Sequence, residues 1–322
     1  MGLWGGTDEN CTQAQVSLSS SDSGPWAKGF RNAFQITNGN QTSGAGADDY
    51  VELSTRIDAQ DVANSGWDYS SASSKLALSF WVKSSVAQNF YGRLQSIDGT
   101  DQNYPFETGS LSANTWTKIT KIIPGGEANL QFDNNNSAGL DIFIIPFQGT
   151  DRTATPTLNA WNAYSSSTKS PDMTSTWYTT NDATFAITGV QLEVGTGTEF
   201  EHRSYADELL RCQRYCRVYG GHAAYQRIGI GYFSNNDRIE CPLPLAPKMR
   251  TTPTMTVSSA GHWKAESPSG SGEFTAVGLD GNSSPQVAIV WGDKSGTFTG
   301  GESGRYLADN TTDARIYLSA EL

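Results

Sequence analysis

Apolar and polar residues alternate with a period of two along much of this chain, and this pattern predicts β-strands. In the clearest segment, residues 75–85, one face carries Leu76, Leu78, Phe80 and Val82. Such alternation is typical of a strand with one buried and one solvated face. A second segment, residues 183–195, alternates in the same way around Gly189, which predicts a β-bulge at that glycine.

About eight segments with strand character lie between residues 30 and 195, and no convincing helical pattern separates them. The other clear segments are residues 33–39, 49–57, 89–99, 115–125 and 139–147. Antiparallel strands in this number commonly form two packed sheets. We therefore predict a jelly-roll β-sandwich domain over residues 1–200.

One helical pattern interrupts the strands, at residues 204–219. Ser204 is a suitable N-cap, and Asp207 stands three residues later, as in a capping box. An apolar seam at steps of four and three consists of Tyr205, Leu209, Cys212, Cys216 and Tyr219. Two glycines follow and end the pattern. We predict that residues 201–220 form a connecting helix.

Residues 221–322 return to short alternating segments separated by turn residues, which predicts a second, smaller antiparallel β-domain. The composition agrees with an all-β fold, because 33 glycines supply turns while 9 Trp, 13 Tyr and 13 Phe supply core volume. A length of 322 residues also exceeds what one hydrophobic core usually serves.

The charge of the chain restricts its partners. The formal net charge is −11, which argues against a nucleic-acid partner, since that would require a basic surface. No stretch approaches 18 apolar residues, so we expect no membrane insertion. The first residues, MGLWGGTDENCTQAQ, lack the charged and apolar regions of a signal peptide, which predicts synthesis in a cytoplasm.

No catalytic motif stands out. The sequence contains no G-x-S-x-G, H-E-x-x-H or phosphate-binding loop. Its 33 acidic residues make chance carboxylate pairs common, so a glycosidase pair is not identifiable. The spacing of Cys212 and Cys216 is not the two-residue gap of zinc or redox sites. We predict that the chain is not an enzyme, with a polysaccharide depolymerase as the less favoured alternative.

One polar segment, residues 161–180, contains four aromatic residues: Trp161, Tyr164, Trp177 and Tyr178. Aromatic rings in a polar loop can stack on sugar faces, with amide and acidic groups beside them. They can equally pack in the core or form an interface with neighbouring subunits. These four residues are the candidates for a glycan-binding or interface site.

Two loops with closely spaced oxygen ligands, residues 98–103 and 133–136, suggest a structural calcium. Asp98 and Asp101 would be its ligands. Turns rich in Asp and Asn look the same without a metal. We therefore expect no cofactor, with calcium at these two aspartates as the alternative.

The amino-acid sequence from residue 190 to residue 219 resembles a linker-and-helix signature of tailed-bacteriophage fibre and virion proteins. The matching residues are Gln191, Leu192, Glu193, Val194, Gly195, Phe200, Glu201, His202, Arg203, Ser204, Tyr205, Glu208, Leu209, Cys212, Gln213, Arg214 and Tyr215. Residues 78–85, 114–125 and 185–195 are similar to the jelly roll, related to carbohydrate-binding modules, that usually precedes this signature. Residues 244–257 look like the C-terminal part of the family. The resemblance covers roughly residues 70–322.

This resemblance implies a structural protein of the virion. Most favoured is a short tail fibre or receptor-binding adhesin that recognises a host-surface glycan. The alternative is a capsid-decoration, head-fibre or other assembly protein, because the repetitive stalk of long fibres is absent. The implied partners are two further copies in a homotrimer, other tail or capsid proteins and a host glycan. Glu201, His202 and Arg203 are expected to hold the two domains in register at their junction, rather than to act as acid and base.

Overall fold

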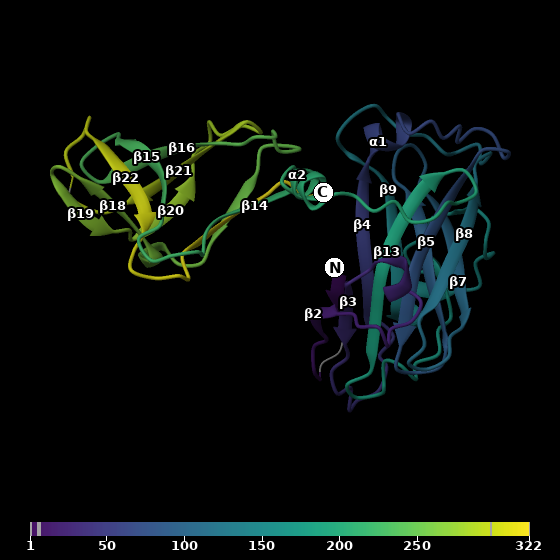
Figure 1. Cartoon of the computed structure of the whole chain (residues 1–322). Coiled ribbons are helices and arrows are strands. Elements are labelled where there is room, and N and C mark those ends of the chain that lie inside the picture. The colour runs from purple at the N-terminus through teal and green to yellow at the C-terminus, as the bar shows by residue number, and fades with distance from the viewer. Residues whose placement is uncertain (1, 5–7, 297, 322) are drawn as a thin grey trace. The chain divides into compact units, whose positions relative to one another are not determined.

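The computed structural model describes residues 2–4, 8–296 and 298–321. The chain divides into two compact units, Met1–Glu201 (unit 1) and His202–Leu322 (unit 2), each built almost wholly of strands (Figure 1). The predicted all-β fold with antiparallel sheets is confirmed. Among the described residues, no helix combines the length and apolarity needed to cross a bilayer.

Unit 1 is a sandwich of two antiparallel sheets. The six-stranded sheet contains, in spatial order, β1 (Gly2–Trp4), β4 (Tyr50–Asp58), β9 (Ala138–Gln148), β6 (Asn89–Ser96), β7 (Gln102–Ser110) and β11 (Asn162–Ala163). The five-stranded sheet contains β2 (Thr12–Ser17), β3 (Asn32–Thr37), β13 (Thr184–Val194), β5 (Lys75–Ser84) and β8 (Thr117–Pro124). The chain crosses repeatedly between the sheets, as in a jelly roll.

Short elements complete unit 1. They are α1 (Ala59–Ala63), the 3-10 turns η1 (Trp26–Lys28) and η2 (Thr150–Arg152), and the parallel pair β10 (Thr153–Ala154) and β12 (Ser170–Pro171). The pair β10 and β12 belongs to residues 150–171, a segment that follows β9 and pairs with β7 through β11. We call residues 150–171 the covering segment.

The period-two pattern corresponds to burial between the sheets. On β5 the predicted apolar face is enclosed, and these side chains share one core with residues of the opposite sheet: Leu94, Phe106, Leu140, Ile142 and Ile144. Burying an apolar side chain of this size contributes about 1.5–3 kcal/mol. The interleaving of both sheets therefore accounts for the strand pattern of the sequence.

The bulge predicted at Gly189 is confirmed. The register between β13 and β5 shifts between Thr188 and Gln191. Gly189 has a φ of +61°, and a Cβ atom built there would lie 2.5 Å from the ring of Phe30. Both the backbone conformation and the space therefore require glycine.

Unit 2 contains a seven-stranded and a three-stranded antiparallel sheet. The larger sheet contains, in spatial order, β19 (Gly270–Glu273), β18 (Trp263–Ser267), β22 (Ser303–Ala308), β15 (Arg227–Phe233), β16 (Arg238–Pro244), β21 (Val287–Asp293) and β20 (Ala276–Leu279). The smaller sheet contains β14 (Cys216–Gly220), β23 (Arg315–Ser319) and β17 (Thr254–Val257). Helix α2 (Tyr205–Cys212) precedes β14, and the 3-10 turn η3 (Ala260–His262) precedes β18.

The helix predicted at residues 204–219 is wrong beyond Cys212. Its start is as expected, because the Ser204 hydroxyl accepts a hydrogen bond from the Asp207 amide. After α2 the chain becomes β14, which pairs along its whole length with β23. Cys216 and Tyr219 therefore belong to a strand and not to the helical seam. Pairing with a distant strand outweighs the local helical pattern here.

Replacing Gly189 with alanine tests the bulge. Gly66→Ala is the matched control, because Gly66 also has a positive φ, +85°, but has open space around it. We expect the control to lose about 1–2 kcal/mol of unfolding free energy and Gly189→Ala to lose about 1–3 kcal/mol more, because the added methyl meets Phe30. Urea unfolding followed by tryptophan fluorescence measures both. Equal losses would contradict the assignment.

Candidate functional site

Two of the four predicted aromatic residues belong to the core, so the prediction is wrong for them. Trp177 and Tyr178 are fully buried. The indole of Trp177 donates to the carbonyl of Thr184 at 3.1 Å, and Tyr178 stacks on Phe147 with ring centroids 4.5 Å apart. Neither ring is available to a sugar. Their polar sequence neighbours misled the prediction, because a turn places these rings between the sheets.

The other two aromatics lie near the six-stranded sheet. Trp161 is half-buried against Tyr104, and its indole donates to the carbonyl of Pro124 at 2.8 Å. Tyr164 is half-buried on the covering segment, with its ring centroid 5.8 Å from the guanidinium carbon of Arg93. A role in glycan binding stays a prediction for these two.

Arg93 is the centre of a buried polar network on the outer face of the six-stranded sheet. It is 2% exposed, its guanidinium lies 3.5 Å from the ring centroid of Phe143, and it donates to Gln95 at 2.7 Å. On the neighbouring strands, Asp141 accepts from Arg56 at 3.1 Å. Burial lowers the pKa of Arg93 to about 10 and raises that of Asp141.

The covering segment closes this network. The Asn103 side chain on β7 donates to the carbonyl of Lys169 at 2.7 Å. Lys169 is 7% exposed, and burial first, then the charges of Arg93 and Arg152, lower its pKa to about 8. Glu52 acts in the opposite direction. We define the Arg93 network as Arg93, Gln95, Asn103, Asp141 and Lys169, and it fastens the covering segment to the sheet.

Asp98 and Asp101 have hydrogen-bond partners within the protein. Asp98 accepts from the Asp133 amide at 3.0 Å, and Asp101 accepts from the Gln95 side chain at 3.1 Å. Over residues 2–4, 8–296 and 298–321, no three His, Cys, Asp or Glu side chains are grouped so that they could hold a metal ion. Both carboxylates thus hold loops of the protein together, and calcium at these two aspartates stays a prediction.

The residues at the end of β13 stabilise the turn that follows. Glu193 accepts from the Thr198 amide at 2.7 Å and from its hydroxyl at 2.8 Å, while Gln191 accepts from the Glu201 amide at 2.9 Å. Arg203 forms an exposed ion pair with Glu208 at 3.3 Å. Glu201, His202 and Arg203 are exposed, and their role in holding the domains in register stays a prediction.

Helix α2 has an uncovered apolar face. None of its eight residues, all of them described, is buried, and Tyr205 is 83% exposed. Leu209, Leu210 and Cys212 are also exposed. Of the other predicted seam residues, Cys216 is exposed on β14 and Tyr219 packs against the core of unit 2. The seam is thus limited to Tyr205, Leu209 and Cys212.

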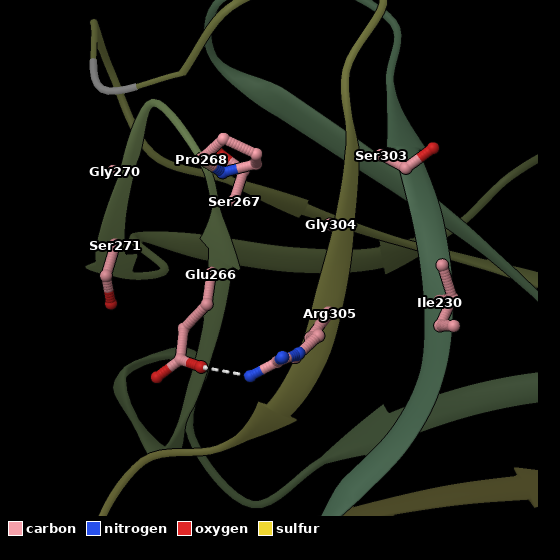
Figure 2. Close-up of a pocket in the computed structure, with 9 residues that line it drawn as sticks. All are labelled: Ile230, Glu266, Ser267, Pro268, Gly270, Ser271, Ser303, Gly304 and Arg305. Atoms are coloured by element: carbon pink, nitrogen blue, oxygen red, sulfur yellow. Dashed lines mark ion pairs between the residues drawn. The ribbon is translucent and has the colours of Figure 1, made fainter.

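An open hollow lies on the outer face of the seven-stranded sheet of unit 2. It encloses about 660 Å³ and is lined by Ile230, Glu266, Ser267, Pro268, Gly270, Ser271, Ser303, Gly304 and Arg305 (Figure 2). The strand register aligns four of these residues across β19, β18, β22 and β15, in the order Ser271, Glu266, Arg305 and Ile230. We call these four residues the row.

The polar side of the hollow is an ion-pair chain. Glu266 lies 3.6 Å from a guanidinium nitrogen of Arg305 and 3.3 Å from the ammonium of Lys264. Lys264 also contacts Asp309 at 3.2 Å. Figure 2 shows the Glu266 and Arg305 side chains pointing toward each other below the hairpin that carries Pro268. Serine hydroxyls at both ends of the hollow add further donors and acceptors.

The apolar side of the hollow is unusually open. Ile230 is 74% exposed. Tyr232, the next outward residue on β15, is half-exposed opposite Ser303, and its hydroxyl donates to Glu240 at 2.8 Å. That hydrogen bond raises the pKa of Tyr232. The hollow thus combines an aliphatic surface with a row of hydrogen-bonding groups, a combination that can hold a ligand rich in hydroxyls, and Tyr232 lies next to it on β15.

Sequence reasoning missed this hollow. The row brings together segments that are far apart in the chain, from residue 230 to residue 305. One signal was present, since Ile230 lies between Gly229 and Gly231 on β15, so neither of its neighbours in the strand supplies a core side chain. That pattern indicates large apolar residues on the outer face.

No protein-family profile matches this chain, and no curated protein matches its sequence. Three similar solved structures are distant. Family 16 Carbohydrate Binding Module-2 is 8% identical, with a TM-score of 0.24, over 51% of this chain and 77% of the other. An exo-beta-agarase is 10% identical, with a TM-score of 0.29, over 70% and 37%. The N-terminal CBM22-1-CBM22-2 tandem domain from Paenibacillus barcinonensis Xyn10C is 10% identical, with a TM-score of 0.29, over 97% and 92%.

Lys169→Met tests whether burial of the ammonium group is unfavourable. Because the folded pKa of about 8 lies below the usual 10.5, the unfolded chain binds more protons between these values. Charged Lys169 therefore destabilises the fold below pH 8, and this penalty disappears as the pH rises toward 10.5. We expect the variant to gain about 1–3 kcal/mol of unfolding free energy at pH 7 and less at pH 9.5.

Urea unfolding at pH 6, 7 and 9.5 measures this gain. Lys118→Met is the control, because Lys118 is exposed on β8 of the same unit. A loss of stability in Lys169→Met at pH 7 would show that the ammonium group has a favourable partner in the network.

Proposed function

We propose that this chain is a non-catalytic glycan-binding protein. The observation that carries the proposal is the hollow of unit 2, in which Glu266, Arg305 and serine hydroxyls lie beside the exposed Ile230. A sugar presents hydroxyl groups at its rim and C–H groups on its faces. Protein groups of both kinds, placed side by side on an open surface, match these two requirements.

The absence of catalysis is part of the proposal. Glycoside hydrolysis generally uses two carboxyl groups placed about 5–10 Å apart across the bond. Among the described residues that line the hollow, Glu266 is the one carboxylate, and it is held between two cations. This arrangement suits hydrogen bonding to a ligand better than proton transfer, and it makes a depolymerase the less favoured function.

More specifically, we propose that the chain is a component of a bacteriophage particle. Support comes from the resemblance of the segment between Gln191 and Tyr215 to a signature of tailed-phage fibre and virion proteins. A short tail fibre or receptor-binding adhesin that attaches to a host-surface glycan fits both the signature and the hollow. A capsid-decoration protein is the alternative. The location and copy number of the chain in purified particles separate the two.

The proposal includes self-association through α2, with a homotrimer as the assembly. An isolated helix of eight residues is marginal in water, so the exposed seam of Tyr205, Leu209 and Cys212 requires a cover. These residues are spaced four and three apart, which is the spacing of helices that pack on copies of themselves. Three parallel copies of α2 would cover one another in this way.

Glycan binding is tested with the full chain on a panel of purified bacterial surface polysaccharides and oligosaccharides. We expect saturable binding, weakened about fivefold by Ile230→Ser because part of the apolar contact is lost. Tyr317→Ser is the control, since Tyr317 is also an exposed apolar residue, on β23 of the smaller sheet. Absence of binding to every glycan would overturn the proposal, and shortening of a bound glycan would refute its non-catalytic part.

Self-association is tested by light scattering at micromolar concentration. We expect the mass of a trimer for the native chain and of a monomer for Leu209→Glu, because a charge in the seam opposes helix packing. Leu210→Glu is the matched control, since Leu210 is equally a leucine of α2 but lies off the seam. A monomeric native chain, or a trimer that tolerates Leu209→Glu, would contradict this assembly.

A further inference from the structure

The two residues of the ion pair in the hollow, Glu266 and Arg305, can still form hydrogen bonds with a ligand. Glu266 and Arg305 lie directly opposite each other on β18 and β22, yet the nitrogen and oxygen are 3.6 Å apart. That separation is longer than a hydrogen bond. The Arg305 side chain is 53% exposed. A third group that reaches this gap can therefore accept from Arg305 and donate to Glu266.

Charge around the hollow argues against an anionic ligand. The charged side chains on and beside the row include Lys264, Glu266, Glu273, Glu302, Arg305 and Asp309, together with the exposed Arg227 of β15 opposite Leu307. Two of the three cations, Arg305 and Lys264, already pair with Glu266 and Asp309. The remaining acids add negative potential in a chain whose net charge is −11. Because the acids outnumber the cations around the hollow, an anion would meet net repulsion, and the favoured ligand is uncharged.

A ligand hydroxyl group is suited to bond to the Glu266 and Arg305 side chains. A hydroxyl group is both a donor and an acceptor, whereas Arg305 only donates and ionised Glu266 only accepts. Two adjacent hydroxyls on a sugar ring can therefore bond to both side chains at once. Hydrogen bonds to charged partners are about twice as strong as those between neutral groups. Ser271 and Ser303 flank the pair and can bond further hydroxyls.

The apolar residues define where the ring would lie. Ile230 follows Arg305 in the row, on the side away from Glu266 (Figure 2). Tyr232 continues the same face of β15. The row crosses three strand spacings of about 4.7–4.9 Å each, so a short saccharide can contact the pair and the apolar surface together. The volume of about 660 Å³ is within the usual range for small-ligand sites.

We propose that the hollow binds an uncharged saccharide through a pair of vicinal hydroxyls that bridges Arg305 and Glu266. This inference rests on the proposed glycan-binding function and names the ligand class of the same site. The pair thus sets specificity, since it selects for adjacent hydroxyls and against carboxylate-bearing sugars, while Ile230 contributes affinity for any ring.

Calorimetric titration of the full chain with neutral trisaccharides of glucose, mannose and galactose, and with trigalacturonate, tests the inference. We expect at least one neutral trisaccharide to bind, and to bind at least tenfold more tightly than trigalacturonate. Arg305→Met and Glu266→Gln should each weaken that binding about tenfold. The double variant should lose little more than either single one, because one pair of hydroxyls depends on both side chains.

Arg203→Met is the matched control, because Arg203 forms an ion pair of similar exposure with Glu208 outside the hollow. Near-identical thermal unfolding of all variants shows that the fold is intact. Tighter binding of trigalacturonate, or neutral binding that is insensitive to Arg305→Met and Glu266→Gln, would overturn the inference and leave glycan binding standing. If no saccharide binds here or on the wider panel, the proposed function fails and the inference fails with it.

Discussion

The burial of one face of each strand is the constraint on which the rest of this structure depends. In unit 1, Phe80 on β5 and Ile142 on β9 belong to a core that both sheets share. Because only every second side chain enters that core, the other side chains form an outer face on each sheet, which is either covered by another segment or exposed to solvent. Part of such a face is covered by another segment of the chain in unit 1, whereas the corresponding face in unit 2 is exposed. This difference affects where a ligand could bind.

In unit 1 part of the outer face of the six-stranded sheet, around Arg93, is covered. The covering segment encloses Arg93 and Lys169, and burial shifts both of their pKa values downward. Such a network holds the covering segment on the sheet, although the burial of its charged groups is unfavourable. In unit 2 the outer face of the seven-stranded sheet stays open, so Arg305 and Glu266 remain hydrated and Ile230 remains uncovered. The same kinds of side chain serve cohesion in unit 1 and, in the function we propose, recognition in unit 2.

Features that depend on neighbouring residues could be predicted from the sequence, whereas features that depend on distant strands could not. The strand at residues 75–84 and the bulge at Gly189 were predictable, because period and glycine placement are local. The end of α2 was not, because β14 forms only where β23, about 100 residues later, supplies its partner. Trp177 and Tyr178 were misplaced, since polar neighbours do not reveal tertiary burial. The row as a whole was not predictable, because it exists only once four strands are in register, and the glycines on both sides of Ile230 were its one local signal.

The alternation along β18, β22 and β15 has an evolutionary consequence. Glu266 follows the buried Ala265, and Arg305 lies between Gly304 and the buried Tyr306, so the outward residues can be exchanged while their inward neighbours keep the sheet packed. Mutational drift in the outward positions is therefore largely uncoupled from selection on folding. A lineage carrying this domain can therefore change the chemistry of this outer face by a few single substitutions while the packing of the sheet is kept.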